Sequence, residues 1–194
     1  EYKGDIQYRK QGSIIAFEDG ESITYKNAVD SVVSSDLYNE LVIPRGGEYV
    51  LTLADGTLVC LNAGSKLRFP VQFSGITRNV ELEGEGYFQV ARNEKIPFVV
   101  NASGVNITVL GTEFNVNTCR KQKVQTVLVK GSVQVENGGK REVVLRPGEL
   151  AETVGTQIRV TQVNVRKYTA WREGVFYFEE AELEEIMTEL ADWY

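Results

Sequence analysis

Between Ser13 and Val163 the sequence is a succession of short apolar runs, interrupted every eight to twelve residues by glycine, asparagine or aspartate. The runs are rich in Val, Ile, Leu, Thr, Phe and Tyr. Runs of this length with turn residues at both ends are typical of β-strands, so the pattern predicts an all-β body. Glycine within or between strands usually marks bends and bulges. We therefore expect a curved β-sandwich or a solenoid-like stack of short strands, with no helix longer than two turns in this range.

Two Asp-Gly pairs predict β-hairpins. Asp19-Gly20 lies between IIAF and SITY, and Asp55-Gly56 lies between YVLTL and TLVCL. Glycine adopts positive φ without steric cost, which the tight turns of hairpins require. Both pairs are therefore expected to join antiparallel neighbours.

Apolar and acidic residues alternate from Val80 to Glu85. The alternation predicts that Glu81, Glu83 and Glu85 project from one face of a strand. Paired carboxylates of this kind also occur in glycoside hydrolases. However, nothing in the sequence isolates one of them in an apolar pocket that would raise its pKa. We interpret the three as a solvated strand face.

Histidine is absent from all 194 residues, which removes Ser-His-Asp and Cys-His catalysis and the histidine-containing zinc sites. The two cysteines, Cys60 and Cys119, are too far apart in sequence for a CxxC redox pair. Their neighbours predict two thiols without a bridge, Cys60 mostly buried in LVCL and Cys119 more accessible in NTCRKQ. The composition thus indicates a non-enzymatic protein without metal or cofactor.

Charge is concentrated at the C-terminal end. Residues 179–192 contain seven acidic residues and no basic one, and the net charge of the whole chain is −6. The rest of the chain is close to neutral and lacks the clustered Lys and Arg that phosphates require, so we expect no nucleic-acid partner. Apolar runs stay far below the ~20 residues of a membrane helix, so no span is predicted within this sequence.

After Trp171 the spacing of the apolar residues along the sequence changes. Phe176 and Phe178 occupy alternate positions and predict a short strand. The following spacing predicts an amphipathic helix with an apolar stripe of Leu183, Ile186, Met187, Leu190 and Ala191. A strand and one helix cannot bury such a stripe alone. It is therefore expected to pack on the β body, on further chain or on a partner.

Aromatic residues give an alternative interpretation. Trp171, Trp193 and nine tyrosines could stack sugars, as in a carbohydrate-binding or adhesin-like β domain. Aromatic residues at this frequency also serve as core and cross-strand pairs. Sugar titration would separate the two interpretations.

Six blocks, in this order and spacing, resemble the FecR family of regulators of extracytoplasmic sigma factors. The resemblance extends from about Pro44 to Ala151, and its strength lies in the set rather than in any one block. The blocks are IPRGGEYVLTLADGTLVCLNAGSKLRF, RNVELEGEGYFQVA, IPFVV, VLGTEFNV, VKGSVQV and LRPGELA.

The resemblance implies a domain division and a function. Residues 1–165 would form the FecR-like all-β domain, and residues 166–194 a linker and the start of a small α+β C-terminal module that continues beyond this sequence. The family's periplasmic part receives a signal from the N-terminal signalling domain of a TonB-dependent outer-membrane transporter. A cytoplasmic part, joined by one membrane helix and absent from this sequence, holds the sigma factor. This chain is thus expected to be the periplasmic portion of a single-pass inner-membrane anti-sigma factor.

The C-terminal part is the expected docking site for the transporter. A partner would bind either by strand addition at 175–178 or through the helix. The alternative is that the helix side chains fill the core of their own module. The candidate partner-binding residues are Val175, Phe176, Tyr177, Phe178, Leu183, Ile186 and Leu190.

Overall fold

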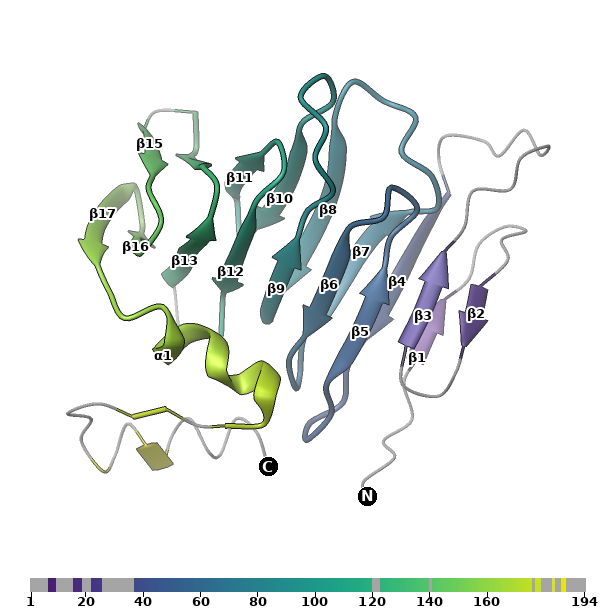
Figure 1. Cartoon of the computed structure of the whole chain (residues 1–194), viewed down its shortest axis with the longest axis horizontal. Helices are drawn as coiled ribbons and strands as arrows, with labels where there is room; N and C mark the ends of the chain where they lie inside the picture. Colours follow the sequence, from purple (N-terminus) through teal and green to yellow (C-terminus); the bar gives the residue numbers. More distant parts are fainter. Residues whose placement is uncertain are drawn as a thin grey trace.

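The computed structural model describes residues 7–9, 16–18, 22–25, 37–119, 123–139, 141–175, 177–178, 183 and 186–187. These residues form two β-sheets that face each other as two layers (Figure 1). In spatial order, the eight-stranded sheet contains β1 (Gln7–Arg9), β4 (Tyr38–Val42), β7 (Lys66–Pro70), β8 (Arg78–Glu83), β10 (Phe98–Ala102), β11 (Val105–Val109), β14 (Val133–Asn137) and β15 (Arg141–Leu145). The nine-stranded sheet contains β17 (Gln157–Gln162), β16 (Glu149–Val154), β13 (Lys123–Lys130), β12 (Glu113–Asn117), β9 (Glu85–Gln89), β6 (Leu58–Leu61), β5 (Tyr49–Thr52), β3 (Ser22–Tyr25) and β2 (Ala16–Glu18).

From β4 onward the chain passes back and forth between the sheets, placing one or two strands in each before it crosses. Each crossing moves it further along the sandwich, from β4 and β5 at one end to β15 and β17 at the other (Figure 1). Most neighbours are antiparallel, whereas β8 with β10 and β3 with β5 are parallel. The predicted all-β sandwich with a solenoid-like progression is confirmed. Within the described part of 13–163 the structure contains strands and turns but no helix.

Both predicted hairpins form. β5 pairs with β6 around Asp55-Gly56, and Gly56 has a φ of 85°. β2 pairs with β3 on either side of Asp19-Gly20, although these two turn residues lie outside the described part of the chain. Asp-Gly was therefore sufficient to place two of the antiparallel pairs.

The core lies between the two sheets. Phe88 stacks on Phe114 with ring centroids 5.2 Å apart, and Phe98 lies 6.3 Å from Phe88. All three rings are fully buried, and burial of such a side chain stabilises the fold by roughly 1.5–3 kcal/mol. In the sequences of β8, β11 and β14 apolar residues alternate with polar ones, which predicts one buried face for each strand. The apolar residues of these faces are all at most 2% exposed, namely Val80, Leu82, Val105, Ile107, Val109, Val133 and Val135.

The prediction that three glutamates share one strand face is wrong for Glu85. Glu81 and Glu83 are exposed on β8, where Arg68 and Lys66 pair with them. At Gly84 the chain crosses from one sheet to the other with a φ of 96°, so Glu85 begins β9. A β-carbon at Gly84 would lie 2.6 Å from the Cα of Ser65. Only glycine fits this crossing, and it separates the third carboxylate from the other two.

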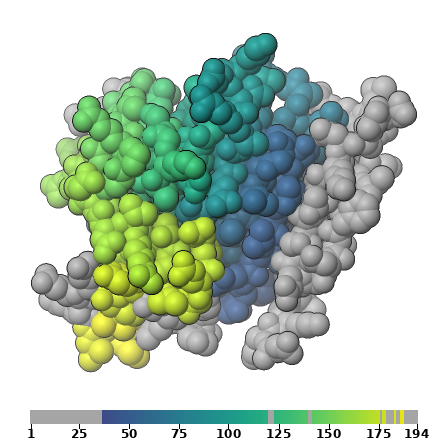
Figure 2. Space-filling model, in the orientation of Figure 1, coloured from purple at the N-terminus to yellow at the C-terminus, as the bar shows by residue number. Residues whose placement is uncertain are grey.

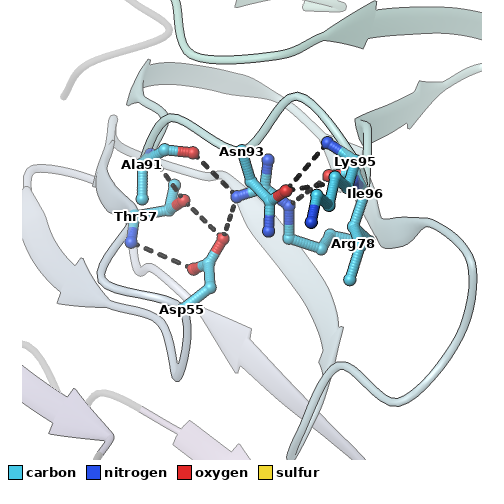
Figure 3. Close-up of polar contacts among 7 residues, drawn as sticks. All are labelled: Asp55, Thr57, Arg78, Ala91, Asn93, Lys95 and Ile96. Atoms are coloured by element: carbon cyan, nitrogen blue, oxygen red, sulfur yellow. Dashed lines mark hydrogen bonds and ion pairs between the residues drawn. The ribbon is translucent and has the colours of Figure 1, made fainter.

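A buried ion pair ties the β5–β6 turn to the start of β8 (Figure 3). The Arg78 side chain is 3% exposed and that of Asp55 12%. Arg78 also donates to the carbonyls of Ala91 and Ile96 at 2.9 Å each. The β5–β6 turn and the β9–β10 loop, which are distant in sequence, thus meet at one guanidinium group at the start of β8.

After β17 the chain forms α1 (Arg166–Thr169) and a 3₁₀ turn, η1 (Ala170–Glu173). This segment, the C-terminal turn, was expected only as linker. It crosses the lower part of the nine-stranded sheet in Figure 1 and lies against the body in Figure 2. Among the described residues, none of the helical segments combines the length and apolar character that crossing a membrane requires.

Candidate partner interface at the C-terminal turn

Trp171 attaches the C-terminal turn to the outer face of the nine-stranded sheet. Its side chain is 8% exposed, and its Nε1 donates to Asn115 Oδ1 at 3.3 Å. Asn115 lies on β12 and is 1% exposed, although it points away from the core between the sheets. The turn therefore covers a strand position that would otherwise face solvent.

The hydrogen bond from Trp171 continues into a polar network beneath the turn. Asn115 Nδ2 donates to Glu85 Oε1 at 2.8 Å, and Asn62 Nδ2 donates to Glu85 Oε2 at 2.8 Å. One carboxylate thus joins β9, β12 and the turn after β6. Because each amide orients its neighbour, the network holds the acceptor of the indole N–H in a fixed position.

Arg172 makes the second contact. Its guanidinium carbon lies 3.5 Å from the ring centroid of Tyr87, a cation–π distance. Tyr87 is buried on β9, and its hydroxyl donates to Glu113 Oε2 at 3.2 Å. Burial raises the pKa of Tyr87 above its ordinary value of 10.0, and the charge of Arg172 partly opposes that rise. The indole of Trp171 therefore contacts β12, and the guanidinium group of Arg172 contacts the adjacent strand β9.

Gly174 ends the turn with a Schellman cap. It has a φ of 67°, its N–H donates to Trp171 O at 2.9 Å, and the N–H of Val175 donates to Ala170 O at 3.3 Å. The cap sets the direction in which the chain leaves the sheet. Since the Val175 N–H is already used, it is not available for strand addition.

Val175 is the last residue of this cap, and the other predicted partner-binding residues follow it. Val175 is 43% exposed, and Tyr177 and Phe178 are half-buried. Tyr177 accepts a 3.4 Å hydrogen bond from Asn164 Nδ2. Val175, Tyr177 and Phe178 are irregular rather than extended in a ladder, so the predicted short strand is not formed by them. Phe176 lies outside the described residues.

The predicted helix is present where the structure describes it. Leu183, Ile186 and Met187 are helical. Leu183 is 74% exposed, Met187 is 58% exposed and Ile186 is half-buried. Leu190 and Ala191 lie outside the described part. The segment beyond the C-terminal turn thus presents apolar side chains to solvent.

Cys60 lies opposite Tyr87 in the β6–β9 ladder, close enough to Arg172 for its charge to act on the thiol. Neither cysteine forms a disulfide, Cys60 is half-buried on β6, and Cys119 is exposed. The predicted order of accessibility is confirmed, although Cys60 is less buried than expected. Burial raises the pKa of the Cys60 thiol above its ordinary value of 9.0.

The described residues offer no cluster of three or more His, Cys, Asp or Glu side chains suited to a metal ion. Trp171 also differs from a sugar-stacking residue because its ring lies against the sheet rather than in solvent. The chemistry available at the C-terminal turn is recognition through apolar contact and hydrogen bonding.

Comparison with protein families matches residues 39–134 to FecR protein. Two crystal structures of a candidate anti-sigma factor from Parabacteroides distasonis ATCC 8503, at 2.50 Å and 1.65 Å resolution, are similar to this chain. The first is 32% identical, with a TM-score of 0.75 over 81% of this chain and 75% of that chain. The second is 32% identical, with a TM-score of 0.74 over 80% and 74%. Comparison with curated proteins finds no match.

The two-sheet body and its similarity to these structures define a regulatory domain of the anti-sigma class. The chain belongs to the FecR family of anti-sigma factors. The family assigned from the six sequence blocks is thereby confirmed, and with it a regulatory role toward sigma factors.

Trp171, Arg172 and Asn115 were not among the residues predicted for the site. The sequence did contain one indication of the C-terminal turn, because Gly174 follows Trp-Arg-Glu in the position of a helix C-cap. Nothing in the local sequence around Asn115 distinguishes it from other strand residues. Its role depends on packing by a segment 56 residues away.

Proposed function

We propose that this chain is the periplasmic signal-receiving part of a membrane-anchored anti-sigma factor. Its C-terminal segment receives the signal from the N-terminal signalling domain of a TonB-dependent outer-membrane transporter, and the cytoplasmic part of the full-length protein acts on an extracytoplasmic-function sigma factor. The work of this domain is binding, with no bond chemistry.

The exposed apolar side chains of Leu183 and Met187 are the observation that carries the proposal. They follow a segment that Trp171 and Arg172 fix to the sheet, so the exposed side chains are tethered to a rigid body. Exposed apolar area beside a fixed anchor favours a protein-binding surface. The resemblance to the FecR family led us to expect the transporter contact in this same segment.

Calorimetry with the complete periplasmic region and the signalling domain of the cognate transporter tests the proposal. Leu183→Asp and Met187→Asp place charge on the proposed contact and should each weaken binding by at least about tenfold, within the range of interface hot spots. The matched control is Ile76→Asp on the β7–β8 loop. Ile76 is 89% exposed, so its replacement introduces the same charge outside the proposed contact.

Two results would contradict the proposal. One is the absence of binding by the unaltered region. The other is unchanged affinity in a Leu183→Asp, Met187→Asp double variant whose circular dichroism shows an intact fold. Tyr177→Pro tests strand addition separately, because it leaves the Schellman bonds of Gly174 and Val175 in place. Val175→Pro would instead remove a bond of the cap.

A further inference from the structure

β17 is the outermost strand of the nine-stranded sheet among the described residues. All six of its residues pair in register with β16, from Gln157 opposite Val154 to Gln162 opposite Glu149. Five of the six are exposed, and Ile158 is half-buried. Within the described ranges this regular edge strand has a hydrogen-bonded neighbour on one side only, and β15 of the other sheet lies close to it without pairing.

The direction of the backbone groups of β17 follows from one bond at its end. The N–H of Val163 donates to Gly148 O, which lies on the β16 side. In an antiparallel ladder the backbone groups of successive residues point to opposite sides. The N–H and C=O groups of Ile158, Val160 and Gln162 therefore point away from β16, toward the open edge.

Natural edge strands are usually protected from pairing by proline, lysine, a bulge or an inward charge. The sequence QIRVTQ contains neither proline nor lysine, and its ladder has no register shift. Ile158 packs against the core cluster, and Val160, on the same face, is 39% exposed. The inner face of the strand is thus apolar at Ile158 and Val160 and polar at Gln162.

Arg159 carries the only charge on the strand. It stands opposite Glu152 in the ladder, but Glu152 instead contacts Lys123 Nζ at 3.5 Å and Gln125 Nε2 at 3.2 Å. Within the described part of the chain Arg159 forms no ion pair. No carboxylate of the described residues is thus within ion-pair distance of this positive charge at the edge of the sheet.

We propose that β17 is a docking edge for an extended strand of a partner protein. The partner strand alternates apolar residues, which continue the inner face beside Ile158 and Val160, with polar residues that include a carboxylate for Arg159. Its backbone completes the ladder at residues 158, 160 and 162, the β-augmentation mode of peptide recognition. This surface lies on the sandwich body and does not depend on the proposed transporter contact.

A second copy of the chain fits this edge less well. When the β17 strands of two copies pair antiparallel, two central registers keep both inner faces on the same side of the joined sheet. One centres on Arg159 and places two guanidinium groups directly opposite each other, and the other centres on Val160 and places them diagonally across the pair. Like charges in direct opposition destabilise a sheet. The charge of the edge thus favours an acidic partner strand.

The test uses two synthetic peptides, TVEVEVT and its basic counterpart TVKVKVT, with the complete periplasmic region. NMR titration should shift the amides of residues 157–162 with the acidic peptide, and the basic peptide should bind at least about threefold more weakly, as one cross-strand charge pair implies. Arg159→Glu should reverse that preference. Val160→Pro removes an N–H that points toward the open edge, and it should weaken binding of the acidic peptide by about tenfold or more.

Val160→Thr is the matched control, because it keeps the N–H and nearly the same shape, and it should retain peptide binding. Equal binding of the two peptides, amide shifts confined to other strands, or unchanged binding in a folded Val160→Pro variant would each overturn the proposal. A concentration-dependent dimer in sedimentation that Val160→Pro abolishes would assign the edge to a second copy and would also overturn it.

Discussion

Arg78 Nη1 lies 2.6 Å from Asp55 Oδ2, and this pair connects the β5–β6 turn to the first residue of β8. Thr57 completes the arrangement, since its N–H and Oγ1 both donate to Asp55 and its Oγ1 accepts from the N–H of Ala91 (Figure 3). The Asp-Gly turn thus has a second role besides reversing the chain. Its aspartate neutralises a charge that is buried between the β5–β6 turn and the β9–β10 loop.

Asp55→Ala should destabilise the fold strongly. It leaves the Arg78 guanidinium buried without its carboxylate, a change that typically costs about 3–5 kcal/mol. Urea denaturation measures the loss in the free energy of unfolding. Arg92→Met is the control, because its pair with Glu94 is largely exposed and should contribute less than about 1 kcal/mol. Equal effects of the two substitutions would contradict a structural role for the buried pair.

Gly84→Ala should destabilise the crossing between the sheets by roughly 2–5 kcal/mol. A left-handed φ costs a non-glycine residue about 1–2 kcal/mol, and overpacking adds about 1–3 kcal/mol. The new β-carbon would meet both Oγ and Cα of Ser65, whose hydroxyl is fixed by two hydrogen bonds to the backbone of Glu85. Thermal denaturation of the variant reports the loss.

Gly104→Ala isolates the backbone part of that cost. Gly104 has a φ of 82°, but a β-carbon there meets no atom within 4 Å. Its replacement should cost only the conformational penalty of about 1–2 kcal/mol. If both variants lost the same stability, the close approach to Ser65 would not contribute.

The local sequence pattern was sufficient to predict much of the sandwich. Alternation identified core residues such as Val80 and Ile107, and Asp-Gly identified hairpins, because both depend on neighbours in the sequence. The parallel pairing of β8 with β10 could not be obtained in this way. Likewise, the alternation through Glu85 was preserved in the sequence while Gly84 moved the chain to the other sheet.

The candidate site was less predictable because long-range packing builds it. The apolar stripe correctly indicated helical Leu183 and Met187, since helical spacing is local. Asn115 and Trp171 meet across the fold, and neither carries a local pattern that pairs it with the other. The sequence therefore indicated which segment leaves the body but not how that segment is held.

Trp171→Phe should loosen the C-terminal turn without unfolding the sandwich. The phenyl ring keeps much of the apolar contact but loses the N–H donor to Asn115, a net loss of about 1 kcal/mol. Hydrogen exchange at the amides of Gly174 and Val175 should accelerate by about fivefold, which is the same energy expressed as a rate ratio. Lys167→Met, an exposed position on α1, should leave both amides unchanged. Unaltered exchange in Trp171→Phe would show that the indole N–H does not hold the turn.

The two thiols should differ in reactivity and in their effect on stability. Near pH 8, Ellman's reagent should modify exposed Cys119 first and Cys60 slowly, because the half-buried thiol is less accessible and burial raises its pKa. Cys119→Ala should remove the fast phase and Cys60→Ala the slow one. A single fast phase accounting for both thiols would contradict this order.

The raised pKa of Cys60 also fixes the sign of a pH dependence. The folded state retains the thiol proton at a pH where the unfolded chain has lost it, so this group's contribution to stability is fully present below the ordinary pKa of 9.0 and is lost as the pH rises above it. Between about pH 8 and pH 10 the free energy of unfolding of the unaltered chain should therefore fall more steeply than that of Cys60→Ala. Urea denaturation at several pH values measures both slopes, with Cys119→Ala as the matched control. A slope that Cys119→Ala changes and Cys60→Ala does not would place the titrating thiol at the exposed position instead.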